Sequence, residues 1–220
     1  MVHRNTTAAL VAMFGLLASV LLVGQQLHAP WAGGDGRVHI AIAAIRQEGA
    51  ATVDRNGTVR PVSLHESIRR GEVVRTDAGG RMVLQIGFCH TLALDENTDV
   101  RLDDLVPGTY RVHLARGRAY LDTHLETPSE NPDCGPLTIT TNKTETAVVS
   151  GKLAIVNYDF KQTVGIAPVD TVAAVVVGSE TGYVLKSAVE ITETDPPQIT
   201  DVLFDPTSGA AAEFYAWATQ

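Results

Sequence analysis

The sequence has little positive charge, few aromatic residues and only two cysteines. Its 17 Lys and Arg are outnumbered by 25 Asp and Glu, which gives a formal net charge of -8 at pH 7. Nucleic acid is therefore not expected as a partner, because binding phosphates needs clustered Lys and Arg. The chain also lacks a Gly-x-Ser-x-Gly elbow, a His-Glu-x-x-His helix and a glycine-rich phosphate loop. We expect a protein that is not an enzyme and uses no cofactor.

The N-terminal segment has no charged residue between Arg4 and Asp35, and its apolar run extends over 8–24. Such a run is near the lower limit for a membrane span and near the upper limit for the apolar core of a signal peptide. Because a cleavage site before Pro30 would be poor, we favour an uncleaved signal anchor over 1–32, with secretion if it is cleaved. Arg4 on the short N-terminal side predicts a single span of the cytoplasmic (inner) membrane, with the body in the periplasm or extracytoplasmic space.

The body consists of short apolar or alternating runs separated by turn residues, with no helical period over ten or more residues. We expect a linker and first strand over 33–43. Further strands are expected over 81–86, 137–140, 146–149, 154–158 and 172–177, with turns at 54–57, 77–80 and 142–143. This pattern predicts an all-β protein with many short antiparallel strands, in a sandwich, jelly-roll or solenoid-like arrangement, preceded by one N-terminal apolar helix.

One predicted hairpin contains the chain's candidate metal ligands. Residues alternate before and after Ala115–Gly117, which is typical of two strands with one buried and one wet face. His113, Asp122 and His124 could meet on the wet face, and two imidazoles with a carboxylate can bind zinc. These are weak candidates, because histidine is common on exposed strands, and we expect no metal site.

The two cysteines, Cys89 and Cys134, suggest a disulfide if the body lies in an oxidising compartment. The alternative of two unpaired thiols stays open at this point. Cys89 and His90 are adjacent in sequence. We do not expect them to form a catalytic thiolate–imidazole pair, since neighbours on a strand point to opposite faces.

The C-terminal extension over 191–220 differs from the body. It is rich in turn residues, and Ala210–Trp217 could form one or two helical turns. Phe214, Tyr215 and Trp217 would be a contact surface for another molecule if the tail were exposed. The alternative is that they dock onto the protein's own core.

Three blocks of the body occur in the order of a known domain. They are Ile68–Thr76 with Gly79–Ile86, then Gly117–Asp122, then Leu137–Thr141 with Val149–Ile155. Together they resemble the FecR-type domain, an extracytoplasmic module of iron-transport sigma regulators and of other bacterial envelope proteins. The resemblance covers 44–190.

The resemblance implies an extracytoplasmic binding or signalling module that recognises a protein or an envelope polymer. FecR-type sigma regulators carry a helical cytoplasmic domain before the span, whereas about seven residues precede the apolar run here. We therefore expect that this chain does not bind a sigma factor directly. The rival hypotheses are a self-associating structural envelope component, a regulator linked to a sigma factor, and an enzyme with an unrecognised site.

Overall fold

A computed structural model describes residues 42–106, 109–123, 134–148, 150–178, 182–192 and 194–220. These residues belong to one compact unit, 39–220. The unit is all-β and its strands are mostly antiparallel, which confirms the fold class expected from the sequence. Among the described strands, β9 and β10 form the one parallel pair.

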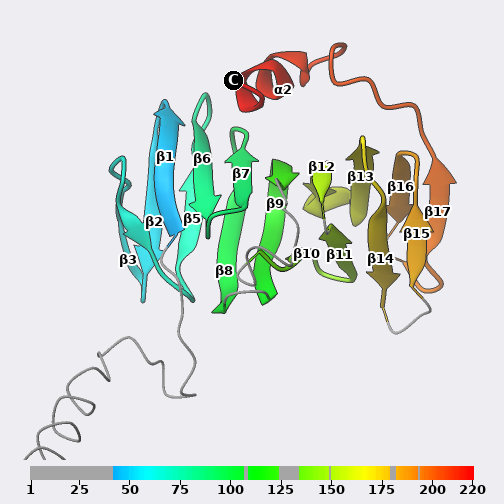
Figure 1. The fold of residues 1–220 in the computed structure, drawn as a ribbon, viewed down its shortest axis with the longest axis horizontal. Helices are drawn as coiled ribbons and strands as arrows, with labels where there is room; N and C mark the ends of the chain where they lie inside the picture. The colour runs from blue at the N-terminus through cyan, green and yellow to red at the C-terminus, as the bar shows by residue number, and fades with distance from the viewer. Residues whose placement is uncertain (1–41, 107–108, 124–133, 149, 179–181, 193) are drawn as a thin grey trace, which may run out of the picture. The chain divides into compact units, whose positions relative to one another are not determined.

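The strands, labelled in Figure 1, form two sheets that share one member, β9, as its strand pairings show. The sheet that the C-terminal helix covers is called here the helix-side sheet. In order across the sheet, its strands are β4 (Ser67–Ile68), β1 (Ile42–Glu48), β6 (Arg81–Ile86), β7 (His90–Leu94), β9 (Thr109–Thr123), β12 (Gly151–Tyr158), β13 (Thr163–Val169), β16 (Val189–Thr192) and β17 (Gln198–Asp201).

The other sheet is called the distal sheet. In order, its strands are β3 (Thr58–Pro61), β2 (Ala51–Arg55), β5 (Val73–Thr76), β8 (Asp99–Val106), β9, β10 (Leu137–Thr140), β11 (Thr144–Val148), β14 (Ala173–Val177) and β15 (Tyr183–Leu185).

A single apolar core includes side chains from both sheets. Leu84, Leu121 and Ile155 enter it from the helix-side sheet, and Leu102 and Val112 enter it from the distal sheet, all fully buried. Each is flanked in sequence by a residue of the opposite face, as the period of two requires in a strand. Burial of this aliphatic cluster is the main force that holds the sheets together.

Several local predictions are confirmed. Strand β6 has the predicted bounds, and β10 and β11 form the predicted hairpin around Asn142–Lys143. Strands β2 and β3 form a hairpin across Asn56 and Gly57, whose φ angles are 54° and 85°. The Asn-Gly pair fits here because both residues tolerate the left-handed backbone conformation that tight hairpins need.

The predicted hairpin at Ala115–Gly117 is wrong, because β9 runs without a turn from Thr109 to Thr123. Its first half pairs with β8 and β10 in the distal sheet, and its second half pairs with β7 and β12 in the helix-side sheet. The inward positions change from even to odd numbers at Gly117, where φ is 95°. The sequence pattern of two alternating runs therefore has another cause, a strand that changes sheets.

Two short helical elements complete the described fold. These are the 3-10 helix η1 (Asp159–Lys161) and α2 (Ala212–Ala218), and α2 confirms the helical turns expected over Ala210–Trp217. Within the described residues no helix is both long and apolar enough to cross a bilayer. The predicted anchor over 1–32 lies outside them, as does all of the 33–43 segment except its last two residues.

Candidate functional site

The outer face of the helix-side sheet is lined with small side chains. Ala93, Ala154 and Ala167 point outward from β7, β12 and β13, and each is at most 5% exposed. Gly165 on β13 adds no side chain at all. Because these residues leave room above the sheet, larger side chains from elsewhere in the chain can pack against it.

The aromatic residues of α2 occupy that room. Phe214 and Tyr215 are 1% and 5% exposed and pack with Val83 and Tyr120 of the sheet. Tyr120 and Tyr215 make an edge-to-face contact at 5.8 Å between ring centroids, a favourable geometry for aromatic pairs. These two residues therefore do not form the exposed contact tail that the sequence allowed. The alternative, docking onto the protein's own core, is what the structure has.

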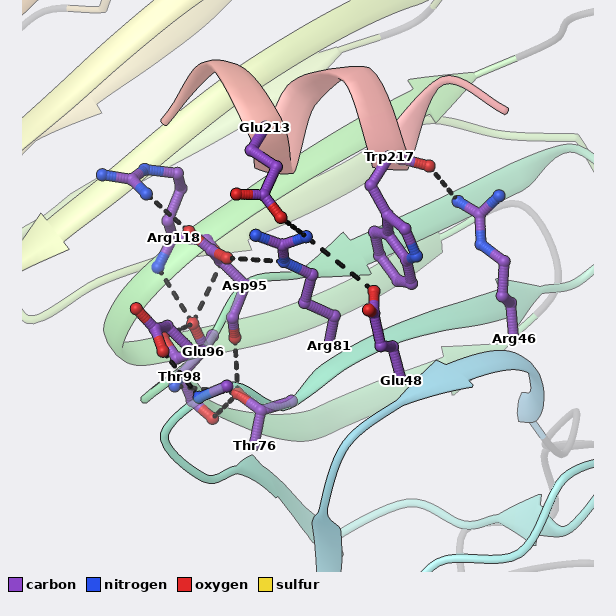
Figure 2. A network of polar contacts seen from close by, with 11 residues as sticks. Arg46, Glu48, Thr76, Arg81, Asp95, Glu96, Thr98, Arg118, Glu213 and Trp217 are labelled. Atoms are coloured by element: carbon purple, nitrogen blue, oxygen red, sulfur yellow. Dashed lines mark hydrogen bonds and ion pairs between the residues drawn. The ribbon is translucent and has the colours of Figure 1, made fainter. Parts of the chain in front are cut away.

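A buried carboxylate organises the polar contacts beside this aromatic cluster (Figure 2). Asp95 lies just after β7 and is 5% exposed. Its carboxylate accepts a hydrogen bond from Nη1 of Arg118 at 2.5 Å and another from Nε of Arg81 at 3.4 Å. Its backbone carbonyl accepts a hydrogen bond of 2.5 Å from the Thr76 hydroxyl. Because buried charge is costly unless paired, Asp95 fixes both arginines at the sheet surface.

Arg81 and a third arginine, Arg46, contact the C-terminal helix. Nη1 of Arg81 lies 3.3 Å from Glu213 of α2 and 3.8 Å from Glu48 of β1. Arg46 donates to the backbone carbonyl of Trp217 at 2.6 Å, and its guanidinium lies 4.3 Å from the indole centroid (Figure 2). Since Arg46 satisfies a carbonyl in the last turn and stacks on the ring, it holds the C-terminal end of α2.

A cleft of about 460 Å³ lies between the sheet and the segment that connects β17 to α2. Its walls are mostly apolar and include Ala154, Ile166, Val202, Leu203, Phe204 and Ala210. Arg118, Tyr158, Glu190, Asp205 and Tyr215 supply the polar groups. An apolar cleft with a few converging polar groups is the usual form of a binding site.

Two groups in this cleft are suited to hydrogen bonding with a ligand. Burial raises the pKa of Tyr215 to about 12, against the opposing effect of Arg118, so its hydroxyl stays protonated at neutral pH. Nε of Arg118 is buried and has no hydrogen-bond partner among the described atoms. A buried unpaired donor is unusual in a native protein. Arg118 itself lines the cleft, and the exposed part of its guanidinium can donate to a ligand.

The candidate metal ligands are not brought together where the structure describes them. Nδ1 of His113 lies 3.1 Å from Oγ1 of Thr140 in the distal sheet, whereas Asp122 pairs with Lys152 in the helix-side sheet. His124 lies outside the described residues. Among the described residues, no three His, Cys, Asp or Glu side chains form a group that could hold a metal ion.

Cys89 and Cys134 are joined as a disulfide, with their Cα atoms 5.6 Å apart. Next to it, His90 is fully buried, with Nδ1 3.1 Å from the Thr123 hydroxyl and Nε2 2.9 Å from the Gly135 carbonyl. Burial lowers the pKa of His90, against the opposing effect of the Gly135 carbonyl. The imidazole thus connects the two cysteine-bearing segments to the end of β9, and takes no part with Cys89 as a catalytic pair.

Sequence reasoning missed Asp95, Arg118 and the alanines of the outer face. A signal was present, since Ala93, Ala154 and Ala167 occupy outward positions where an exposed sheet carries polar residues. Small apolar residues at such positions indicate a face that another element covers. The partner of Asp95 could not be inferred in this way, because Arg118 is 23 residues away in sequence.

Comparison with known proteins gives a likeness of fold. No family model matches the sequence, and neither does any curated protein. The structure is similar to two crystal structures, each of a "putative anti-sigma factor" from Parabacteroides distasonis. One has a TM-score of 0.52 at 14% identity over 66% of this chain and 63% of that one, and the other has 0.51 at 13% identity over 61% of each.

The chain therefore spans less than two thirds of the length of these structural neighbours. At such low identity the likeness shows a shared fold. The neighbours bear the printed name of a regulatory class, to which FecR-type sigma regulators also belong.

Proposed function

We propose that this protein is a FecR-like regulatory module that binds a protein or envelope ligand outside the cytoplasm, without catalysing a reaction. The observation that carries the proposal is the fold that it shares with the anti-sigma factor structures. The three FecR-type sequence blocks all lie in the strands and turns of the two sheets, apart from Val149. The fold and the motifs thus support the same proposal.

The cleft beside α2 is the proposed binding site. Its apolar walls supply contact area, and the guanidinium of Arg118 and the hydroxyl of Tyr215 supply direction. Leu203, which lines the cleft, is fully exposed and adds apolar surface that a ligand could cover. A ligand with an apolar body and a hydrogen-bond acceptor suits this combination.

Photo-crosslinking tests the site in the full chain. A photoreactive amino acid at Ser208, which lines the cleft, should give an adduct of discrete mass in membranes of the native host. The same residue at Thr58, on β3, is the control and should give none.

A cleft-filling variant sharpens the test. Ala210→Trp fills the cleft from an exposed position and should abolish the Ser208 adduct. Ala216→Trp, at another exposed alanine that does not line this cleft, should leave it intact. An adduct that both substitutions leave unchanged contradicts binding in the cleft.

We further propose that 1–32 holds the body at the outer face of the cytoplasmic membrane, as its apolar run and Arg4 suggest. Spheroplasts treated with protease provide the test. The body should be digested from outside and should sediment with membranes before digestion. A body that is protected in intact spheroplasts contradicts this topology, and a freely soluble body indicates cleavage and secretion.

The rival role, a regulator linked to a sigma factor, is favoured by the printed name of the structural neighbours. Transcript profiles separate the two roles. Overproduction of the full chain should repress a defined set of promoters if it restrains a sigma factor, and should leave them unchanged if its output is contact outside the cytoplasm.

A further inference from the structure

The floor of the cleft contains a row of four positions on neighbouring strands of the helix-side sheet. Arg118 of β9 pairs with Val156 of β12, which pairs with Gly165 of β13. Gly165 pairs in turn with Glu190 of β16. All four residues line the cleft, and each has a neighbour in sequence that belongs to the apolar core, so the row faces outward. Because neighbouring strands are about 4.8 Å apart, the row is about 14 Å long.

The two ends of this row differ in charge. The guanidinium of Arg118 is already paired with the buried carboxylate of Asp95, so this end offers hydrogen-bond donors with little net charge (Figure 2). The carboxylate of Glu190, at the other end, is exposed and makes no ion pair or side-chain hydrogen bond within the described residues. Asp205 adds a second carboxylate to the cleft. The described lining of the cleft therefore has an excess of negative charge.

The middle of the row is open. Gly165 has no side chain, and a Cβ atom built there would have Val156 as its nearest neighbour, at 4.0 Å. An apolar group of a ligand can therefore lie over Gly165. The rings of Tyr158 and Phe204 also line the cleft, and aromatic rings attract cations through their electron-rich faces. The cleft thus combines room for an apolar group with groups that favour a cation.

We propose that the cleft binds an extended peptide segment, with a Lys or Arg side chain paired with Glu190 and an apolar side chain over Gly165. This inference rests on the binding role proposed for the cleft. A peptide fits because its backbone carbonyls are acceptors for the donors of Arg118 and Tyr215. Four extended residues span about 14 Å, the length of the row. The net charge of -8 on the chain also attracts a positively charged partner.

A peptide library tests this specificity in the full chain. The chain with a photoreactive amino acid at Ser208 is incubated with blocked hexapeptides of random sequence. Mass spectrometry of the adducts should show Lys and Arg about fivefold more often than Asp and Glu. Glu190→Lys should reverse this preference. Glu145→Lys, on β11 of the distal sheet, makes the same change in net charge away from the cleft and should leave the preference unchanged.

Two substitutions at Gly165 test the middle of the row. The side chain of Gly165→Leu would occupy the space meant for the apolar group, so the yield of peptide adducts should fall about tenfold. Gly165→Ala adds a Cβ atom that the site accommodates, and it should keep most of the yield. Unchanged adducts in Gly165→Leu contradict the placement of the apolar side chain.

Three results overturn the proposal. These are peptide adducts without a preference for Lys and Arg, a preference that Glu190→Lys and Glu145→Lys affect equally, and the absence of any peptide adduct. The Ser208 adduct in membranes of the native host separates this failure from failure of the proposed function. If that adduct forms while no peptide adduct does, the cleft binds a ligand of another class, and if neither forms, binding in the cleft is also refuted.

Discussion

Phe214 is the side chain on which the docking of α2 depends most. It is 1% exposed and packs against the outer face of the helix-side sheet, so Phe214→Ala removes a full aromatic contact. Such substitutions cost about 3–5 kcal/mol at buried sites. A seven-residue helix has no stability of its own, so this loss should exceed what holds α2 in place. The core between the sheets does not include Phe214, and we expect it to remain folded.

Fluorescence of Trp217 reports this event directly. The chain has two tryptophans, so a Trp31→Phe background leaves Trp217 as the sole reporter. Docked Trp217 is half-buried against Arg46, and release into water should shift its emission to longer wavelength in Phe214→Ala without denaturant. Chymotrypsin should then cut at Tyr215 while the body stays intact. Phe160→Ala, at a side chain 77% exposed, is the matched control and should change neither signal.

Two results would refute the reasoning. If Trp217 keeps its emission in Phe214→Ala until the sheets unfold in urea, α2 belongs to the same cooperative unit as the core. If Phe214→Ala instead prevents the whole body from folding, the outer cluster stabilises the sheets and is more than a docking site for the tail.

The remaining predictions concern the sheets. Asp95→Ala should cost about 2–3 kcal/mol in urea unfolding, because it removes the buried carboxylate that pairs with Arg118 and leaves Arg81 only its contacts with the more exposed Glu48 and Glu213, whereas Asp103→Ala, at a partly exposed pair, should cost under about 1 kcal/mol. His90 has a lowered pKa in the folded state, so its contribution to stability is complete above about pH 6.5 and is lost as pH falls below that value, by at most about 1.4 kcal/mol per pH unit. The free energy of unfolding, measured at pH 7.5 and at pH 5.5, should differ less between the two pH values in His90→Gln than in the unsubstituted chain. His65→Gln should keep the full difference. Gly117→Ala should destabilise by about 2–4 kcal/mol in thermal melts, since φ is 95° and the added Cβ would collide with Thr98.

Local features were predictable because they depend on neighbours in sequence. Strand β6 follows from an alternating apolar run after a Gly-Gly turn, and the β2–β3 hairpin follows from Asn56–Gly57. The helical turns of α2 were predictable in the same way, from a short segment of helix-forming residues. In each case the backbone preference of a few adjacent residues decides the structure.

The all-β class and the division into short strands were thus determined by the sequence alone. The course of β9 was not, because a turn and a change of sheet both interrupt the alternation at Gly117, and only the pairing with β7 and β12 distinguishes them. The aromatic tail was ambiguous for the same reason. Whether Phe214 and Tyr215 are exposed or buried depends on alanines of distant strands that leave room for them.

The candidate site is decided almost wholly by tertiary structure. Asp95 and Arg118 have no recognisable motif, and they meet because β7 and β9 are neighbours in the sheet. The cleft exists because the segment after β17 returns across the outer face to place α2. Sequence fixes local backbone preference through adjacent residues, whereas a binding surface depends on contacts between residues far apart in the chain, which only the assembled sheets bring together.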